Sequence, residues 1–305
     1  MTRGRSPRSL DPGRLRAELR RILTEVVRDV DDVIRRPRPT PGSLHRLHRA
    51  MRGLRTALAI WGELLGEVGK AQLRPLEARI RRLTRLVGQV RDRDVAVRLL
   101  EEVEKRAGSE EEQGQLRQYR SRLEEDARTG RELLRAFLRS ERQARLFDHV
   151  GEAFELRTRA LARSDLRRVL ADHQRRGREK VATAHRRARR RPSMNRLHRL
   201  RIRVRRLRQM SDLASAVDPG HDPALAESLR RLQQHLGHLH DLDVLLHDLD
   251  PALLESEWAG YLRKERRQQR KAITKVLKSR KPIRAPVDPR EATDESVGTA
   301  PPTPT

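Results

Sequence analysis

The sequence predicts an all-α protein built from two helical bundles of similar plan. Apolar residues recur along most of the chain at the three- and four-residue spacing of an amphipathic helix, and no run of β-branched residues bounded by turns indicates a strand. In addition, the basic segment Leu44–Leu58 returns 153 residues later as Leu197–Met210. Because duplicated units usually pack about a twofold axis, we expect tandem repeats related by pseudo-twofold symmetry.

The first helices of the first repeat have clear start and stop signals. Residues 1–10 are polar and Arg-rich and are expected to form a flexible basic arm. A helix is predicted over Pro12–Arg36, with Asp11 as its cap and Pro37 as its end. After the segment PRPTPG, Ser43 is the expected cap of the basic helix that follows.

The rest of the first repeat is predicted to contain four more helices. One covers about residues 69–87 and is expected to end at Gly88, because glycine commonly terminates helices. The next is expected to begin at Asp92 or Asp94 and to run to about residue 106. The last two are expected at about residues 112–139 and, after a cap at Ser140, up to residue 154.

The second repeat follows the same order. A helix at about residues 156–190 is stopped by Pro192 and precedes the second basic helix. The next helix is expected to end at Gly237, because HLHDLDVLL matches QVRDRDVAV of the first repeat with Gly237 on Gly88. A last helix at about 255–279 closes the fold. These elements divide the chain into a first repeat at about 11–154, a second repeat at about 155–280 and a disordered tail at 281–305.

Each basic helix carries two neighbouring stripes. In the first copy the apolar row from Leu44 to Leu65 alternates by three and four residues and includes Trp61, so this row should pack into the core. Beside it, four basic residues occur at offsets 0, 3, 7 and 10, which places them on one face. The candidate binding residues are His45, His48, Arg49, Arg52 and Arg55 in the first copy and His198, Arg201, Arg205, Arg206 and Arg208 in the second.

The charge of the chain indicates an anionic partner. The 305 residues include 70 Lys or Arg against 43 Asp or Glu, a formal net charge of +27, and such a field repels itself unless something neutralises it. Residues 33–62 and 180–211 contain no acidic residue, although a solvated helix usually mixes charges to gain i,i+4 pairs. The two basic stripes are therefore expected to bind an anion.

A linear polyanion fits these stripes better than a small metabolite does. Arginine pairs phosphate oxygens in a bidentate way, histidine adds a donor that can take up a proton, and a stripe of four bases spans about 15 Å. Nucleic acid is the competing ligand because its backbone alone binds strongly to basic surfaces. However, the chain has only two Trp, two Tyr and three Phe for stacking on bases, and no helix-turn-helix or zinc-finger spacing is visible.

Several other classes of protein are not expected. The chain has no Cys, which excludes disulfides and thiolate metal sites. No apolar run approaches the roughly 18 residues of a membrane span, and the N-terminus has no apolar signal core, so we expect a cytoplasmic protein without a membrane partner. The histidines between residues 235 and 247 have no counterparts in the first repeat, so no metal site and no cofactor are expected.

Two pairs of aspartates do repeat. Asp92 and Asp94 of the first copy correspond to Asp241 and Asp243 of the second. We interpret them as supporting carboxylates that cap helices or pair with the arginine stripes. General acid–base catalysis is the alternative, but no nucleophile or phosphate-cradling glycine loop accompanies them, so no catalytic residue is assigned.

The doubled composite motif resembles that of a known family. Both copies of L-H-x-L-[HR]-x-x-[MV]-R-x-L-R are followed about 40 residues later by G-x-[VL]-x-D-x-D-V, as in the CHAD domain, the conserved histidine α-helical domain. The resemblance covers roughly residues 11–280. It implies two four-helix-bundle halves around a basic cavity or pore, binding of inorganic polyphosphate without enzymatic activity, and targeting to polyphosphate granules. His48 departs from the pattern, since the family usually has Arg there.

The expected function is therefore a non-enzymatic module that binds polyphosphate on its histidine and arginine stripes. Affinity should grow with polymer length and fall steeply with salt. It should also rise as the pH drops through about 6.5, where His45, His48 and His198 would become charged. A nucleic-acid-binding protein of modest specificity and a hydrolase acting on polyphosphate remain as alternatives, and the oligomeric state is left open.

Overall fold

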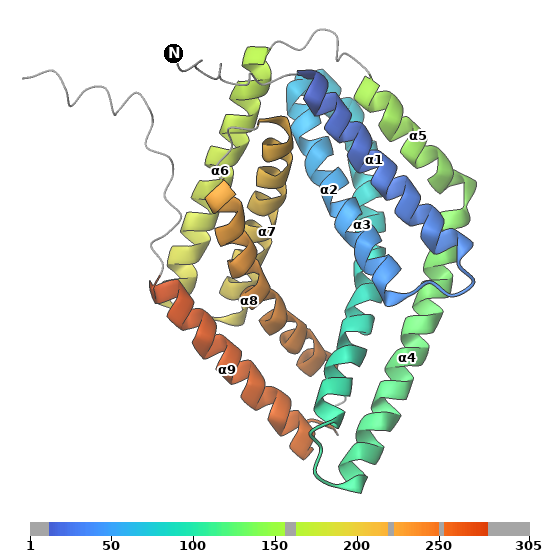
Figure 1. Ribbon diagram of the computed structural model, residues 1–305, viewed down its shortest axis with the longest axis vertical. Helices are drawn as coiled ribbons and strands as arrows, with labels where there is room; N and C mark the ends of the chain where they lie inside the picture. The colour runs from blue at the N-terminus through green and yellow to red at the C-terminus, as the bar shows by residue number, and fades with distance from the viewer. Residues whose placement is uncertain (1–11, 156–162, 219–222, 250–252, 280–305) are drawn as a thin grey trace, which may run out of the picture.

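The described part of the chain is entirely helical apart from short connections. This computed structural model describes residues 12–155, 163–218, 223–249 and 253–279, and within these ranges it contains nine α-helices and no strand (Figure 1). The predicted basic arm, the Asp11 cap, the first residues of the helix expected from 156, and the predicted tail lie outside these ranges. The helices are α1 (Pro12–Arg35), α2 (Pro41–Leu64), α3 (Gly66–Glu104), α4 (Glu110–Arg139), α5 (Glu141–Glu155), α6 (Arg163–Arg190), α7 (Met194–Val217), α8 (Pro223–Asp248) and α9 (Glu257–Ser279).

The N-cap of the basic helix α2 lies three residues before the expected cap. Thr40 is the N-cap, and its Oγ1 accepts a hydrogen bond of 3.2 Å from the backbone N–H of Ser43. The hydroxyl of Ser43 donates to the Thr40 carbonyl at 2.8 Å. The prediction of Ser43 as the cap was wrong, because Pro41 is compatible with the first turn of a helix and lets the helix start directly after Thr40.

Helices α3 and α8 run straight through the glycines that were expected to end them. Among the described glycines only Gly66, the first residue of α3, has a left-handed backbone, with φ of 73°. Gly88 lies inside α3 and Gly237 inside α8. The predicted breaks at Gly88 and Gly237, and the caps at Asp92 or Asp94, were therefore wrong. Apolar residues on both sides of each glycine are buried on the same side of the helix, and this packing outweighs the roughly 1 kcal/mol by which glycine weakens a helix.

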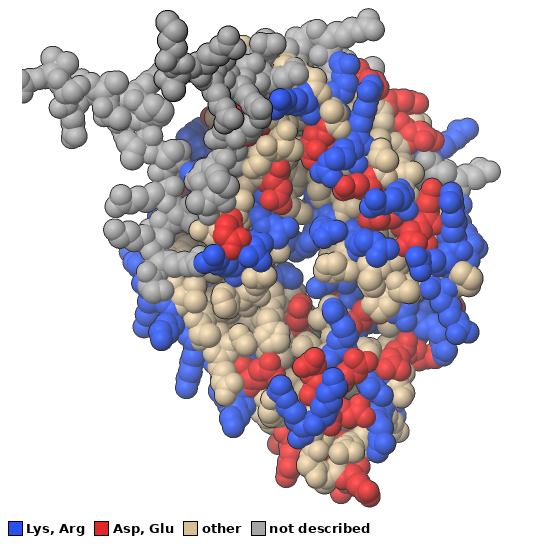
Figure 2. All heavy atoms as spheres, in the orientation of Figure 1, with Lys and Arg blue, Asp and Glu red and all other residues tan. Residues whose placement is uncertain are grey.

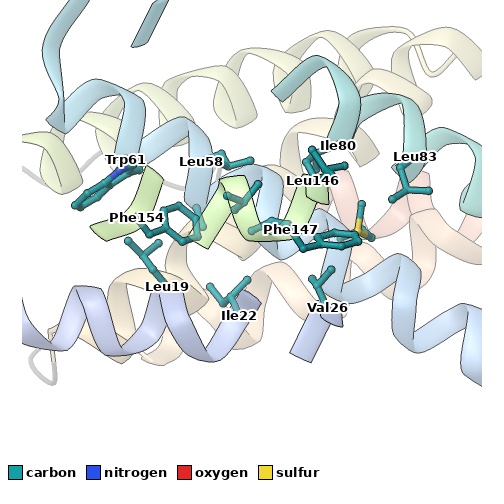
Figure 3. Close-up of a cluster of buried hydrophobic side chains, with 14 of the residues drawn as sticks. Leu19, Ile22, Val26, Leu58, Trp61, Ile80, Leu83, Leu146, Phe147 and Phe154 are labelled. Carbon is teal, nitrogen blue, oxygen red and sulfur yellow. The ribbon is translucent and has the colours of Figure 1, made fainter. Parts of the chain in front are cut away.

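The first core lies among α1 to α5 and also includes buried leucines of α6 and α7. Trp61 of α2 is fully buried, as its place in the apolar row predicted, and its indole N–H donates to the carbonyl of Ala153 at 2.8 Å. Phe154 of α5 meets the Trp61 ring edge-on, with ring centroids 6.1 Å apart. Figure 3 shows how these rings, together with Phe147, fill the space between α1, α2 and α3. Helix α5 thus covers the core of the first half.

The second half has its own core and joins the first at both ends. Buried residues of α6 to α9 form the second core, including Leu200, Val204 and Leu207 of α7. A third cluster packs the C-terminal part of α3 against α8 and α9, with Leu100 and Trp258 among its members. At the other end α1 and α2 pack against α6 and α7. Between these junctions α2 and α3 stand opposite α7 and α8 (Figure 1).

Candidate functional site

The two basic helices face each other across a single central cleft. The cleft has a volume of about 580 Å³ and is lined by α2 and α3 from the first half and α7 and α8 from the second. Figure 2 shows Lys and Arg side chains bordering openings near the middle of the molecule. Nine of the ten candidate basic residues line the cleft: His45, His48, Arg49, Arg52, Arg55, His198, Arg201, Arg205 and Arg208.

The remaining candidate, Arg206, lies beside the cleft. It lines a side chamber of about 300 Å³ that Arg52, Arg55 and Arg205 also line. It lines a second groove on the outer side of α7 as well. Arg206 corresponds to Gly53 rather than to an arginine in the first copy, so the repeat offered no partner for it.

The register of the helices explains why the basic residues reach the cleft. In α2 the apolar row is fully buried, whereas Arg52 and Arg55 on the adjacent face are only partly covered. In α7 the corresponding row is also buried, and Arg201 and Arg205 lie beside it. Neighbouring positions on a 3.6-residue helix are about 100° apart, so one face enters the core while the next meets the cleft.

The sequence interpretation missed the contribution of the second pair of helices. Helix α3 presents Arg81, Arg85 and Arg91 to the cleft, and helix α8 presents Gln233 and His240. Their helical spacing could have identified them, because residues 81, 85, 88 and 92 share one face. The helix break expected at Gly88 concealed this continuity.

Gly88 lets the histidine of α2 approach α3 closely. A Cβ at residue 88 would lie 3.4 Å from Nε2 of His48. Gly237 in the second half also lines the cleft but has no such neighbour within 4 Å. The glycine of the repeated motif therefore lines the cleft in both halves, and in the first half a Cβ in its place would come into van der Waals contact with His48.

The arginines of the cleft are held in an unfavourable cationic environment. Burial, and next the charge of Arg205, lower the pKa of Arg52 to about 9. Burial, and next the charge of Arg201, lower the pKa of Arg205 to about 10. Burial likewise lowers the pKa of Arg55 and of Arg201. The Nε of Arg52 is buried and has no hydrogen-bond partner among the described residues, so a bound anion would relieve both the repulsion and the missing hydrogen bond.

The histidines share this environment. Burial, followed by the charges of Arg52 and Arg91, lowers the pKa of His48 to about 3. His240, whose ring centroid lies 5.1 Å from that of His198, also has its pKa lowered to about 3, first by burial and then by Arg201. Burial lowers the pKa of His45 and of His198 as well. The pKa values of these imidazoles in the free protein therefore lie below the ordinary value of about 6.5 at which the sequence had suggested that they charge, with the large shifts at the more buried His48 and His240.

The four repeated aspartates separate into two kinds. Asp92 and Asp241 line the cleft, where Arg91 bonds Asp92 at 2.9 Å and lies 4.0 Å from Asp241. Asp94 and Asp243 point elsewhere. Asp94 pairs with Arg131 of α4, and Asp243 accepts a hydrogen bond of 2.5 Å from Arg266 of α9. These outer aspartates tie α3 to α4 and α8 to α9 rather than positioning the arginine stripes.

The histidines of α8 have different surroundings, since His240 lines the cleft and His238 contacts α9. His238 lies 2.9 Å from a carboxylate oxygen of Glu265, which links α8 to α9. Within the described ranges no group of three or more His, Asp or Glu side chains is placed to hold a metal ion. Over the same ranges, no helix has the length and apolarity required to cross a bilayer.

Comparisons with known proteins agree with this architecture. The family model described as CHAD domain matches residues 13–250 and 213–290. The crystal structure of the CHAD domain from the plant Ricinus communis superposes with a TM-score of 0.67 at 22% sequence identity, and the match covers 92% of this chain and 99% of that one. At this identity the likeness shows the fold alone. No curated protein matches the sequence.

Proposed function

The chain belongs to the CHAD domain family, and from this membership and the central cleft we propose that it binds inorganic polyphosphate. The observation that carries the proposal is the convergence of arginines from both halves on one cleft, where burial and mutual repulsion lower their pKa values. A polyanion would neutralise several of these charges at once. We further propose that this binding brings the protein to polyphosphate granules in the cytoplasm.

The binding is multivalent and electrostatic. Each guanidinium can pair phosphate oxygens in a bidentate way, and each contact releases counterions from the polymer. Contacts from α2, α3, α7 and α8 act together on one chain, so affinity rises with polymer length and falls steeply with salt. His45, His48 and His198 add donors between the arginines.

We also infer that the fold consists of two copies of one four-helix unit. Consecutive helices pack in the same order in each half, α1 to α4 and then α6 to α9. The Asp94–Arg131 and Asp243–Arg266 pairs occupy equivalent places, between the third and fourth helices of each unit. Helix α5 has no counterpart after α9 among the described residues. The cleft then lies about the pseudo-twofold axis.

Hydrolysis of polyphosphate is the alternative that the cleft aspartates raise. Burial raises the pKa of Asp241, and Arg91 and Arg201 partly offset this effect. Both Asp92 and Asp241 lie beside Arg91, which gives them a role in positioning that side chain. We therefore propose binding without catalysis, and release of orthophosphate from polyphosphate incubated with the purified protein would contradict this.

Competition between polyanions tests the proposed ligand. Labelled long-chain polyphosphate bound to the protein is challenged with double-stranded DNA, RNA and tripolyphosphate at equal phosphate concentration and moderate salt. We expect unlabelled long-chain polyphosphate to compete strongly and the nucleic acids to compete weakly. Equal competition by DNA or RNA would identify a general nucleic-acid surface instead.

The double variant Arg52→Glu with Arg205→Glu tests the place of binding. Both residues line the cleft and lie off the buried apolar row, so we expect loss of binding with the helical circular dichroism spectrum retained. The matched control is Arg14→Glu with Arg122→Glu, which makes the same change in net charge at exposed positions of α1 and α4. If the folded cleft variant binds as tightly as the control, the cleft is not the site.

A further inference from the structure

The central cleft has two side openings that differ strongly in charge. One leads through the side chamber, where Arg52, Arg55, Arg81 and Arg205 line both cavities. The other lies against α1 and shares Arg49 and Arg208 with the cleft. We call the second opening the α1 mouth. A polymer longer than the cleft must leave it through one of these two openings. The charge of each opening therefore decides which one the polymer follows.

The α1 mouth carries almost as many carboxylates as arginines. Glu18, Glu25, Asp29 and Asp212 line it together with its arginines. These carboxylates are engaged with the arginines, since Arg21 pairs with both glutamates and Arg208 lies 3.5 Å from Asp212. A phosphate chain leaving this way would meet four carboxylates and, except for Arg49, arginines that are paired with them.

An outer groove adjoins the side chamber at Arg206, and its lining is strongly basic. This groove, which we call the α6–α7 groove, has a volume of about 880 Å³ and shares Arg206 with the side chamber. Ile202 lines both the groove and the central cleft. The basic residues that line it are Lys180 and Arg187 of α6 and Arg196, Arg199, Arg203 and Arg206 of α7.

The basic residues of the groove lack acidic partners. Its one acidic residue, Glu179, is paired with Arg175 at 3.4 Å. None of the six basic side chains forms an ion pair with a carboxylate of the described residues. Arg187 and Arg199 are exposed and face each other across the groove from α6 and α7. Because an exposed helix surface usually intersperses acids among its bases, this groove is a surface whose counter-charge comes from outside the protein.

We propose that the α6–α7 groove is a second binding segment for the same polyphosphate chain, which continues from the central cleft through the side chamber and past Arg206. This inference rests on the proposed function, because it takes polyphosphate as the occupant of the cleft. Short chains occupy the cleft alone. Long chains occupy the cleft and the groove together, which makes the chain run to one side of the molecule and leaves the α1 mouth empty.

The double variant Arg187→Glu with Arg199→Glu tests the groove. Affinities for tripolyphosphate and for long-chain polyphosphate are measured over a series of salt concentrations, with Arg14→Glu and Arg122→Glu as the control of equal charge. We expect the groove variant to lose about tenfold or more in affinity for the long chain and about two units of salt slope. Its affinity for tripolyphosphate and both affinities of the control should stay within about twofold of the unsubstituted protein.

Every other outcome contradicts the proposed binding in the groove, and each identifies a different cause. Unchanged long-chain binding by the variant overturns the groove while leaving the cleft intact, and an equal loss in the control shows a general field effect. An equal loss for tripolyphosphate shows that the substitutions act on the cleft itself. A loss of DNA binding without a loss of long-chain polyphosphate binding makes the groove a nucleic-acid surface. Absence of polyphosphate binding by the unsubstituted protein overturns the proposed function as well.

The milder double variant Arg187→Gln with Arg199→Gln tests the groove even where the charge-reversed variant does not fold. It removes the two charges without adding acids, and the side chains remain long and polar. We expect a smaller loss of long-chain affinity than with glutamate, and again no change for tripolyphosphate. A loss that does not scale with the charge removed would overturn the electrostatic role of the groove.

Discussion

The positive charge of Arg52, a single residue of the cleft, is unfavourable for the stability of the fold. Its side chain is partly buried, its Nε is buried without a hydrogen-bond partner among the described residues, and its pKa is lowered to about 9. A base whose pKa is lower in the folded than in the unfolded state destabilises the fold when it is charged. This cost is fully present below pH 9 and disappears as the pH rises toward the unfolded value.

Replacing this charge should stabilise the protein while it weakens binding. We expect Arg52→Met, which keeps the length of the stem, to raise the Tm of the free protein at pH 7.5 by about 2 °C or more. Polyphosphate affinity should fall in the same variant. Arg14→Met at an exposed position is the control, and differential scanning calorimetry gives the comparison. A lower Tm for Arg52→Met would mean that the arginine contributes packing or pairing that outweighs its charge.

We expect the histidines of the cleft to govern the pH dependence of the proposed binding. In the free protein the neighbouring arginines and burial lower the pKa values of His45, His48 and His198. A bound polyanion raises these pKa values because it opposes the arginine charges. Binding therefore takes up protons, and affinity rises as pH falls between the bound-state and the free-state pKa values.

The pH range over which affinity changes is therefore lower than the sequence suggested, but affinity still rises as the pH falls. Affinity should continue to increase below pH 6.5 rather than level off there, because burial and the neighbouring arginines lower the pKa values of the free histidines. Calorimetric titrations in buffers of different ionisation enthalpy at about pH 5.5 should detect proton uptake. A binding constant that does not change between about pH 7.5 and pH 5 would assign these histidines a purely structural role.

At the level of the helices, Asp92 and Asp94 of the same motif have different contacts. Asp94 is buried against Arg131 and ties α3 to α4, whereas Asp92 lines the cleft beside Arg91. Removing one partner of a buried ion pair leaves the other uncompensated. The two aspartates are two residues apart on the same helix, so their substitution separates stability from binding.

We expect Asp94→Ala to destabilise the protein by about 3 kcal/mol, with polyphosphate affinity unchanged in the molecules that remain folded. Asp92→Ala should have little effect on stability, and it should strengthen binding slightly because it removes a negative charge from the cleft. Denaturant unfolding and binding titrations on the two variants give the comparison. Equal destabilisation by both substitutions would refute the division of roles.

The helix boundaries show how packing overrides local signals. A glycine followed by two aspartates is a reasonable signal for the end of one helix and the start of the next. In α3 the buried row continues from Leu83 and Val87 to Val90 and beyond, so the helix gains more from staying continuous than it loses at Gly88. The same argument applies to α8. The sequence correctly predicted α1, α4 and α9 to within a few residues because those helices lie between prolines, acidic breaks or turns.

At the level of the whole molecule, ligand binding should lock the two halves together. The cleft is lined from both halves, and its charges repel across it when it is empty. A bound polyanion attracts both walls and binds only the folded state. Stability should therefore increase with ligand concentration, by about 2.7 kcal/mol at a hundred times the Kd.

This effect can be separated from general salt effects. We expect long-chain polyphosphate to raise the Tm by several degrees at concentrations where the same amount of phosphorus as orthophosphate raises it little. Arg52→Glu with Arg205→Glu should lose most of the increase. Equal shifts from both forms of phosphate would indicate weak screening of the surface charge rather than a multivalent site.

The sequence alone determined the helical class, the duplicated basic helix, the buried row that contains Trp61 and the face on which the arginines lie. These properties depend on spacing along one helix, which the chain carries locally. The tertiary structure decided the rest, because distances between helices are not encoded in any single segment. It brought α3 and α8 into the cleft with Arg91 and His240, directed Asp94 and Asp243 away from it, and set the pKa values through burial and charges from the opposite half.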